Sequence, residues 1–279
     1  MNLKQLQDNW DAFGKIDPFW SILTLPDRKE NKWEIDEFFT TGRVEIDEVM
    51  KYIESFCKSL VYRSALDFGC GVGRLTQALA TYFDEVSGVD IAPSMIELAQ
   101  RYNRHGDRCK YYLNETDELK FFRDSSYDFI YTRITLLHLE PKYTKGYIKE
   151  FLRILRPQGM LIFDLPGSIC NAGRPIGKGL KQFVKSITPS PMLRLYRRIR
   201  GVSPQQPQME EYAIGRQEIS ELLEESGARI SATRDLMELG LKEIALLRER
   251  GIKVVLAPEE EDLFQTRRGV DYQYFVTKR

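Results

Sequence analysis

The sequence predicts an α/β fold built on a doubly wound, mostly parallel sheet. Between about residues 61 and 165, short apolar runs alternate with amphipathic helical patterns, which is typical of βαβ units. A glycine-rich turn, Gly69-x-Gly71-x-Gly73, lies between the first apolar run and the helix that follows it. The chain has 279 residues, 42% hydrophobic and 29% charged, so it is long enough for one elaborated water-soluble domain or two small ones.

The charge balance excludes a strong overall attraction to polyanions. Lys plus Arg and Asp plus Glu number 41 each. No net charge therefore draws the chain to nucleic acid or to a membrane surface. We expect nucleic acid not to be a partner.

The cysteines predict the compartment. Cys57, Cys70, Cys109 and Cys170 are scattered and form no CxxC pair, which is typical of reduced thiols rather than of a disulfide frame or a zinc site. No apolar run reaches the length of a membrane-spanning helix, and the first residues lack the apolar core of a secretory signal. We therefore expect a cytoplasmic protein that holds no metal ion.

The first sixty residues predict a helical, aromatic-rich cap. Its aromatic residues are Trp10, Phe13, Phe19, Trp20, Trp33, Phe38 and Phe39. After Gly42, apolar residues from Ile46 to Leu60 fall on one stripe and predict a long amphipathic helix. We expect residues 1–60 to form the cap and residues 61–279 to form the core domain.

Five strands are predicted in the first part of this core. They are expected at about residues 64–68, 85–89, 110–113, 128–132 and 160–163. Helices are predicted after the first, second and fourth of them; the second opens at Pro93, a good first-turn residue. Ligands of such sheets bind beyond the carboxyl ends of the strands, so we expect the chemistry in the loops after strands one, two and four.

Beyond the fifth strand the regular alternation is interrupted twice. Insertions are predicted at about 166–214 and 236–268, the second with a helix near 241–247. Between them a helix carrying Ile219, Leu222 and Leu223 precedes a strand near 229–233, and the chain closes on an alternating strand at 271–277.

The glycine turn predicts a backbone that approaches a ligand closely. Arg74 stands where the dinucleotide pattern GxGxxG has its last glycine, so a dinucleotide site fits poorly. Asp67 precedes the turn, where its carboxylate suits a ligand with an ammonium and a sulfonium better than a pyrophosphate. Asp90 lies about twenty residues further on and can accept hydrogen bonds from both ribose hydroxyls. Taken singly, the glycines could serve only the turn, and Asp90 could be a helix cap.

Four segments together resemble the class I S-adenosylmethionine-dependent methyltransferases. These are residues 65–75 (ALDFGCGVGRL), 86–95 (VSGVDIAPSM), 128–141 (DFIYTRITLLHLEP) and 155–163 (LRPQGMLIF). The N-terminal aromatic segment resembles the cap of a bacterial small-molecule and glycan-type subgroup of this family. The resemblance implies a Rossmann-like, doubly wound, mostly parallel sheet with an antiparallel last strand, an N-terminal helical cap and insertions after strands five and six.

The resemblance also implies a cofactor site for S-adenosylmethionine, with S-adenosylhomocysteine as product. Asp67 and the loop residues Gly69, Cys70, Gly71 and Gly73 would hold the methionine end, with Cys70 as a small loop residue rather than a nucleophile. Asp90 would hold the ribose, and Ile91 and Met95 would flank the adenine. Asn114, Glu115, Thr116 and Asp117 all lie where the family contacts the adenine amine, and Glu115 and Thr116 are taken as cofactor-binding. Thr132, at the end of the fourth strand, and Arg43, which could pair with the cofactor carboxylate or be solvated, complete the expected set.

Methyl transfer to a hydroxyl benefits from a general base. Of the two histidines, His138 follows the fourth strand on the catalytic side and is the predicted base, although it could only shape the pocket; His105 is expected at the surface. We expect O-methylation of a small or glycan-type hydroxylated acceptor. N- or C-methylation of a small metabolite and a non-catalytic cofactor-binding module are the alternatives, and a nicotinamide oxidoreductase is disfavoured by Arg74 and Asp67.

The first insertion suggests what the acceptor carries. Residues 165–209 contain eight Lys or Arg and no acidic residue, and a helix is predicted near 190–200 with its arginines off the apolar face. The stretch 178–200 could contact an anionic membrane surface, cover a pocket for an anionic or lipid-linked sugar-type substrate, or be a docked lid with solvated arginines. The oligomeric state stays open.

Overall fold

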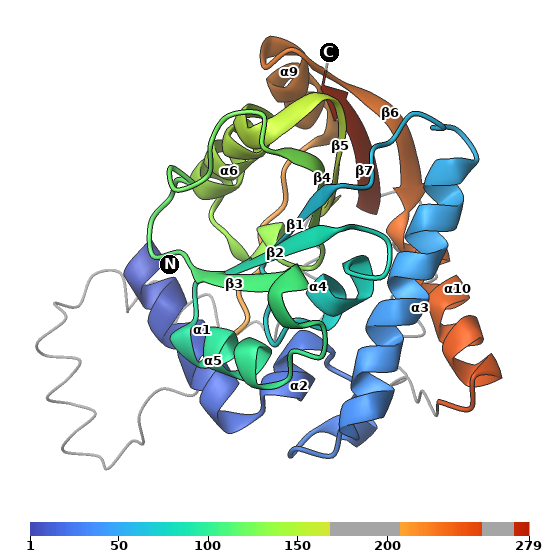
Figure 1. Cartoon of the computed structure of the whole chain (residues 1–279). Helices are drawn as coiled ribbons and strands as arrows, with labels where there is room; N and C mark the ends of the chain where they lie inside the picture. The colour runs from blue at the N-terminus through green and yellow to red at the C-terminus, as the bar shows by residue number, and fades with distance from the viewer. Residues whose placement is uncertain (168–206, 253–270, 279) are drawn as a thin grey trace, which may run out of the picture.

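The protein is organised around one twisted sheet with helices on both faces (Figure 1). The structure, a computed structural model, describes residues 1–167, 207–252 and 271–278. The predicted helix at 190–200, the whole stretch 178–200 and Cys170 lie outside these residues, as does the part of the second predicted insertion beyond residue 252.

The described part of the sheet has seven strands in the order β3-β2-β1-β4-β5-β7-β6. The strands are β1 (Ser64–Phe68), β2 (Glu85–Asp90), β3 (Cys109–Leu113), β4 (Tyr127–Thr132), β5 (Leu155–Pro166), β6 (Ala228–Asp235) and β7 (Asp271–Lys278). β1 to β5 pair in parallel, and β7 runs antiparallel between β5 and β6. The predicted doubly wound sheet with an antiparallel last strand is confirmed. Its strand order reverses between β1 and β4, which is where such sheets open a crevice at their carboxyl ends.

Each face of the sheet is covered by its own helices, because side chains alternate across a strand. Leu66 and Phe68 of β1 pack on the face that carries α6 (Pro141–Ile154) and α9 (Arg216–Glu225). Ala65 packs on the opposite face, with α3 (Ile35–Glu54) and α4 (Arg74–Leu79). The second insertion contributes α10 (Leu236–Glu249), which contacts α3, β6 and β7.

The helix predicted from Ile46 to Leu60 is α3, with different ends. It begins at Ile35 and stops at Glu54, so the prediction that Phe56, Cys57 and Leu60 continue it is wrong. These three residues continue the apolar pattern of the helix in the sequence. In the structure, however, Phe56 follows the helix, is 39% exposed and packs on Phe275. Apolar periodicity does not by itself distinguish a helical turn from a loop that packs on the same cluster.

The N-terminal helices cross the carboxyl ends of the strands. α1 (Leu3–Ile16) and α2 (Pro18–Ile22) lie beside α5 (Pro93–Arg101) at that edge (Figure 1). α1 is held there by Asp11, whose carboxylate accepts the backbone N–H of Ser94 at 2.9 Å. Phe19, Trp33 and Phe38 pack with Met95 of α5 in a separate apolar cluster. This edge of the sheet is therefore covered by residues from the beginning of the chain.

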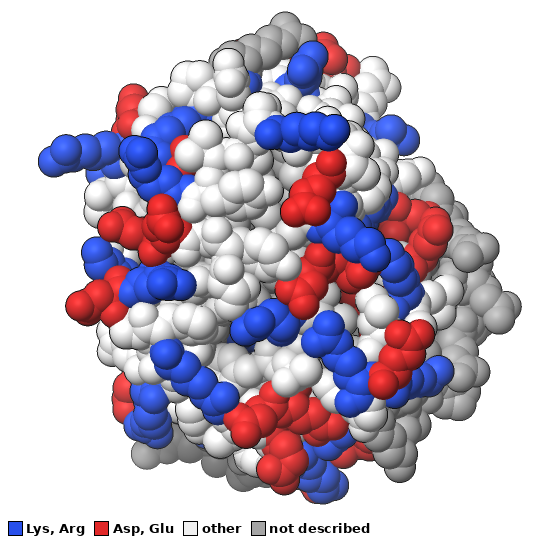
Figure 2. All heavy atoms as spheres, turned by 45° about the vertical axis from the view of Figure 1, so that its right-hand side comes forward, with Lys and Arg blue, Asp and Glu red and all other residues white. Residues whose placement is uncertain are grey.

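Two observations concern membrane-spanning helices and the distribution of charge in the described residues. No helix in the described ranges is long and apolar enough to cross a membrane. On the face turned toward the viewer in Figure 2, basic and acidic side chains are interspersed. Ion pairs join the region of α10 to α3: Lys242 of α10 pairs with Glu48, and Arg250, just after α10, pairs with Asp47 at 3.6 Å.

Candidate functional site

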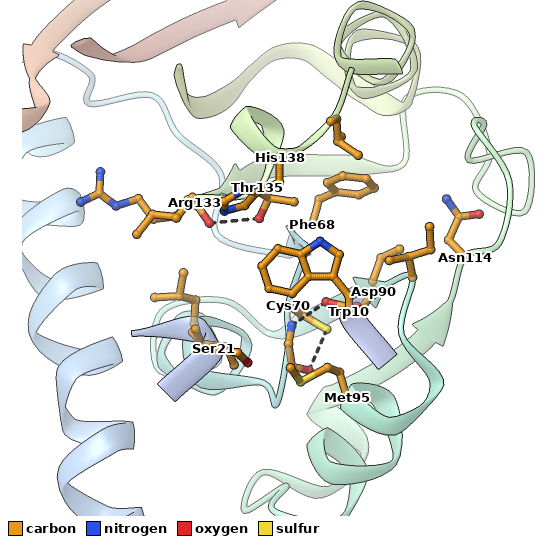
Figure 3. A pocket seen from close by; sticks show the side chains of 18 of the residues that line it. Trp10, Ser21, Phe68, Cys70, Asp90, Met95, Asn114, Arg133, Thr135 and His138 are labelled. Carbon is orange, nitrogen blue, oxygen red and sulfur yellow. Dashed lines mark hydrogen bonds between the residues drawn. The ribbon is translucent and has the colours of Figure 1, made fainter. Parts of the chain in front are cut away.

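A pocket opens where β1, β2 and β4 end, beneath α1 and α2 (Figure 3). The sheet loops line it with Gly69 to Gly71, Asp90, Ile91 and His138 among others. The N-terminal helices contribute Leu6, Trp10, Ser21 and Ile22. Asn114 and Arg133 lie at opposite ends of this space, with Trp10 between them (Figure 3). The loops expected to carry the chemistry thus meet one another, and the N-terminal segment closes over them.

Two glycines of the β1–α4 turn are required by close contacts. Gly69 has a φ of +76°, and a Cβ there would lie 2.2 Å from Oγ1 of Thr135. Gly71 has a φ of +51°, and its Cβ would lie 2.5 Å from Cδ1 of Ile22 in α2. The backbone of this turn therefore passes directly between the β4 loop and the N-terminal helices. Gly73 lies outside the pocket, against Tyr111, where it starts α4.

Asp90 lies at the end of β2 and faces the pocket. Its Oδ2 accepts the N–H of Gly71 at 2.8 Å and its Oδ1 accepts the N–H of Ala92 at 2.9 Å. Each carboxylate oxygen keeps a further lone pair for a ligand hydroxyl. Burial raises the pKa of this carboxyl, while hydrogen bonds from the backbone N–H groups of Ala92, Gly71 and Ile91 oppose the rise. Ile91 and Met95, the predicted adenine neighbours, line the same pocket.

Asp67, the other predicted acidic ligand, does not line the pocket. It is 1% exposed, and its Oδ2 accepts a hydrogen bond from Oγ1 of Thr76 in α4 at 2.6 Å. Burial raises the pKa of Asp67 to about 7, against the opposing effect of the Thr76 hydrogen bond. The side chain thus joins β1 to α4 behind the loop.

After β3, Asn114 is the residue that lines the pocket. Its Nδ2 donates to the carbonyl of Thr116 at 3.0 Å and to the hydroxyl of Tyr147 at 3.2 Å. Glu115 turns to α1 instead, where its Oε1 accepts a hydrogen bond from Nε2 of Gln7 at 2.8 Å. Glu115 and Thr116 are not among the lining residues. Of the four residues left open by the sequence, the structure brings Asn114 to the site.

Two buried arginines line the pocket where Arg43 and Thr132 were expected. Arg43 is exposed and Thr132 is buried, and neither lines the pocket. Arg74 and Arg133 do, with side chains 4% and 8% exposed. Nε of Arg74 and both Nε and Nη1 of Arg133 are buried without a hydrogen-bond partner among the described residues. Two signals in the sequence could have predicted these arginines as site residues. Arg74 directly follows the glycine turn, and Arg133 is a charged residue that directly follows the fourth strand.

His138 is held in one orientation. Its Nδ1 lies 2.7 Å from the carbonyl oxygen of Glu210, and since a carbonyl only accepts, Nδ1 carries the proton. The ring packs against Trp10 with centroids 5.1 Å apart. Burial lowers the pKa of His138 below its usual value, although the Glu210 carbonyl opposes this. A neutral imidazole with a proton on Nδ1 has a lone pair on Nε2. His105 is partly exposed and outside the pocket.

The sheet and its loops are similar in sequence to parts of known methyltransferases. The sequence model of a family described as a methyltransferase domain matches residues 66–163. A sterol 4-C-methyltransferase of Caenorhabditis elegans is 33% identical over 104 residues, which are 36% of this chain and 30% of the relative. A ubiquinone biosynthesis O-methyltransferase of Idiomarina loihiensis is 28% identical over 156 residues, 52% of this chain and 63% of the relative.

A solved structure extends the likeness to the whole fold. The magnesium protoporphyrin IX methyltransferase of Synechocystis, crystallised with bound S-adenosylhomocysteine, covers all of this chain and all of its own. Its TM-score is 0.57 and its sequence identity 15%, so the likeness is one of fold. The chain spans 30% and 63% of the two curated relatives, so what it shares with them in sequence is a domain and not a whole protein.

Proposed function

We propose that the chain uses S-adenosylmethionine to methylate a hydroxyl group of a small or glycan-type acceptor, since residues 66–163 match the model of a methyltransferase domain and the chain shares the fold of a solved methyltransferase. The observation that carries the proposal is that His138, with its lone pair on Nε2, lines the same pocket as the glycine turn and Asp90. A site with both features can hold a methyl donor and deprotonate an alcohol.

The residues that line the pocket match the chemical groups of S-adenosylmethionine. S-adenosylmethionine carries a ribose, an ammonium, a carboxylate and a sulfonium, and when bound it supplies an already activated methyl group. Asp90, Ile91 and Met95 line the pocket, and we assign Asp90 to the ribose hydroxyls and the two apolar residues to the faces of the adenine. The guanidinium of Arg74, a residue that lines the pocket, supplies a positive charge that suits the carboxylate. Trp10 adds an aromatic surface, whose attraction to a cation is about 0.5–2 kcal/mol.

His138 would accept, at Nε2, the proton that the acceptor hydroxyl loses during methyl transfer. A bound donor would supply the methyl group to the acceptor oxygen, and its sulfonium would become a neutral thioether as the S–C bond breaks. The Glu210 carbonyl keeps the proton of Nδ1 in place, so Nε2 is the basic nitrogen. Once an acceptor is identified, His138→Asn should lower turnover by about 10²–10⁴-fold, the usual contribution of a general base.

Cofactor binding tests the proposal directly. S-adenosylmethionine or S-adenosylhomocysteine at about 100 times its dissociation constant should stabilise the protein by about 2.7 kcal/mol, which corresponds to a rise in Tm of roughly 5–10 °C, and NAD should give no rise. Asp90→Ala should weaken the binding about tenfold or more by calorimetry, since it removes a charged hydrogen-bonding partner. The matched control is Asp107→Ala, which alters an exposed carboxylate away from the pocket.

The outcomes separate the candidate functions. Absence of stabilisation by both sulfur ligands would overturn the proposal. Binding without turnover on any alcohol, phenol, amine or activated carbon, followed with a methyl-labelled donor, would favour a non-catalytic cofactor-binding module. N- or C-methylation is the second enzymatic candidate, supported by the sequence similarity to the sterol 4-C-methyltransferase. The chemical position of the label in the product distinguishes it from O-methylation.

A further inference from the structure

Glu45 of α3 is a buried carboxylate that joins two arginines of the pocket wall. It is 5% exposed. Its Oε2 accepts a hydrogen bond from Nη2 of Arg74 at 2.8 Å, and its Oε1 accepts one from the hydroxyl of Tyr131 at 2.8 Å. Nε of Arg133 lies 3.6 Å from the same Oε1. Both carboxylate oxygens are therefore held, and the side chain has little freedom to turn.

The carboxylate stays ionised in this buried position. Burial alone would raise its pKa, but the guanidinium groups of Arg74 and Arg133 and the Tyr131 hydrogen bond hold the pKa of Glu45 below its usual value. A buried charge pair of this kind is retained only when its geometry is good and its other lone pairs are satisfied. The arrangement fixes Arg74 in place more firmly than a surface ion pair would.

The backbone beneath this ion pair is fixed as well. Gly42, one turn before Glu45 on α3, lies so close to α4 that a Cβ would be 2.5 Å from the carbonyl oxygen of Arg74. The hydroxyl of Thr41 is 3.4 Å from Nη1 of Arg74. Of the arginine nitrogens only Nε is left without a hydrogen-bond partner in the described residues. Arg74 thus lines the pocket while two of its three nitrogens are hydrogen-bonded to Thr41 and Glu45 of α3.

We propose that Glu45 is a positioning residue: it holds Arg74 so that the guanidinium binds the carboxylate of S-adenosylmethionine. The inference rests on the proposed function of the pocket. Glu45 lies outside the matched residues 66–163, so the N-terminal segment supplies part of the donor specificity of the domain. Its role is to set the distance between the guanidinium and the ligand, because a shift of about an ångström is enough to break a charge-assisted hydrogen bond.

The experiment compares two ligands that differ only in the carboxylate. Binding of S-adenosylmethionine and of decarboxylated S-adenosylmethionine, which keeps the ammonium, is measured by calorimetry for the full chain and for three variants. Glu45→Asp keeps the charge but shortens the side chain by one methylene, so it should reduce the preference for the carboxylated ligand about tenfold. Glu45→Gln keeps the length and loses the charge, so it should reduce that preference less than Glu45→Asp. Glu48→Asp, on the same helix and paired with Lys242 of α10, is the control and should leave the preference unchanged.

Each result decides a different question. An unchanged preference in Glu45→Asp, or an equal loss of both ligands, would overturn the positioning role. A wild-type protein that binds the two ligands equally would overturn it too, since the carboxylate would then not be recognised. If the wild-type protein binds neither ligand, the proposed function itself fails. Should Glu45→Asp not fold, Tyr131→Phe removes one of the hydrogen bonds that orient Glu45 and should lower the same preference to a smaller extent; no change would count against the role.

Discussion

At the scale of single residues, two carboxylates at neighbouring strand ends have different surroundings. Asp67 and Asp90 are both buried, and burial raises the pKa of each. Asp67 is bonded to Thr76 behind the turn, whereas Asp90 is bonded to backbone N–H groups beside the pocket. A carboxyl with a pKa of about 7 and a hydroxyl partner suits a structural link, and one with backbone donors and a free lone pair on each oxygen suits a ligand.

His138 predicts a pH dependence of stability that requires no acceptor. Because burial lowers its pKa in the folded protein, the unfolded chain binds this proton first as the pH falls. The contribution of His138 to the free energy of unfolding should therefore fall progressively below about pH 6.5, the usual histidine pKa. His138→Asn keeps a donor for the Glu210 carbonyl but does not titrate, so its urea-unfolding free energy should fall less between pH 8 and pH 5.5.

The control for this measurement is His105→Asn, which removes a less buried histidine outside the pocket. Its pH profile should stay closer to that of the wild type. Parallel profiles for the wild type and His138→Asn would show that His138 is not held neutral by the fold.

At the scale of the elements, the contact between α3 and α4 sets the position of Arg74. Replacing glycine by alanine inside a helix ordinarily stabilises it by about 0.5–1 kcal/mol. At Gly42 the new Cβ would meet the backbone oxygen of Arg74 at 2.5 Å, and backbone cannot rotate away as a side chain can. Gly42→Ala should therefore destabilise the protein by about 1–3 kcal/mol, the usual cost of overpacking.

Gly146 in α6 provides the matched comparison. A Cβ there meets nothing within 4 Å, so Gly146→Ala should stabilise the protein by about 0.5–1 kcal/mol. Both free energies of unfolding are read from denaturant melts of the purified variants. Equal stabilisation by the two substitutions would mean that α3 can move away from α4 without loss, which would also weaken the case for Glu45.

At the scale of the whole molecule, stability depends on the central strands, which are buried on both faces. Phe129 of β4 is fully buried and stacks on Phe83 at 5.0 Å, on the face covered by α3 and α4. Phe129→Ala should cost about 3–5 kcal/mol. This is a large part of a typical folding free energy of about 5–15 kcal/mol, so the variant should unfold at much lower urea concentration.

Phe121 is the control at this scale, because it is 48% exposed and sits outside the main sheet. Phe121→Ala should change the unfolding free energy far less. A small effect at Phe129 as well would contradict a close-packed core around β4.

The sequence by itself determined the sheet and the position of the glycine turn between β1 and α4. Strand alternation, glycine spacing and the two strand-end acids are local patterns, and the contacts that enforce them are made within a few residues or between adjacent strands. Asp90 and His138, predicted from their positions after strands, and Ile91 and Met95, implied by the family resemblance, all line one pocket.

The tertiary structure decided which of several neighbouring candidates face the pocket and what holds them. Asn114 lines it and Glu115 does not, because Glu115 is drawn to Gln7 of α1. Arg74 and Arg133 replace Arg43 there, and Glu45 holds Arg74 from a helix about thirty residues earlier in the chain. The Glu210 carbonyl fixes His138 from 72 residues away. Such partners carry no pattern in sequence, since their pairing depends on how separate elements pack and not on their spacing along the chain.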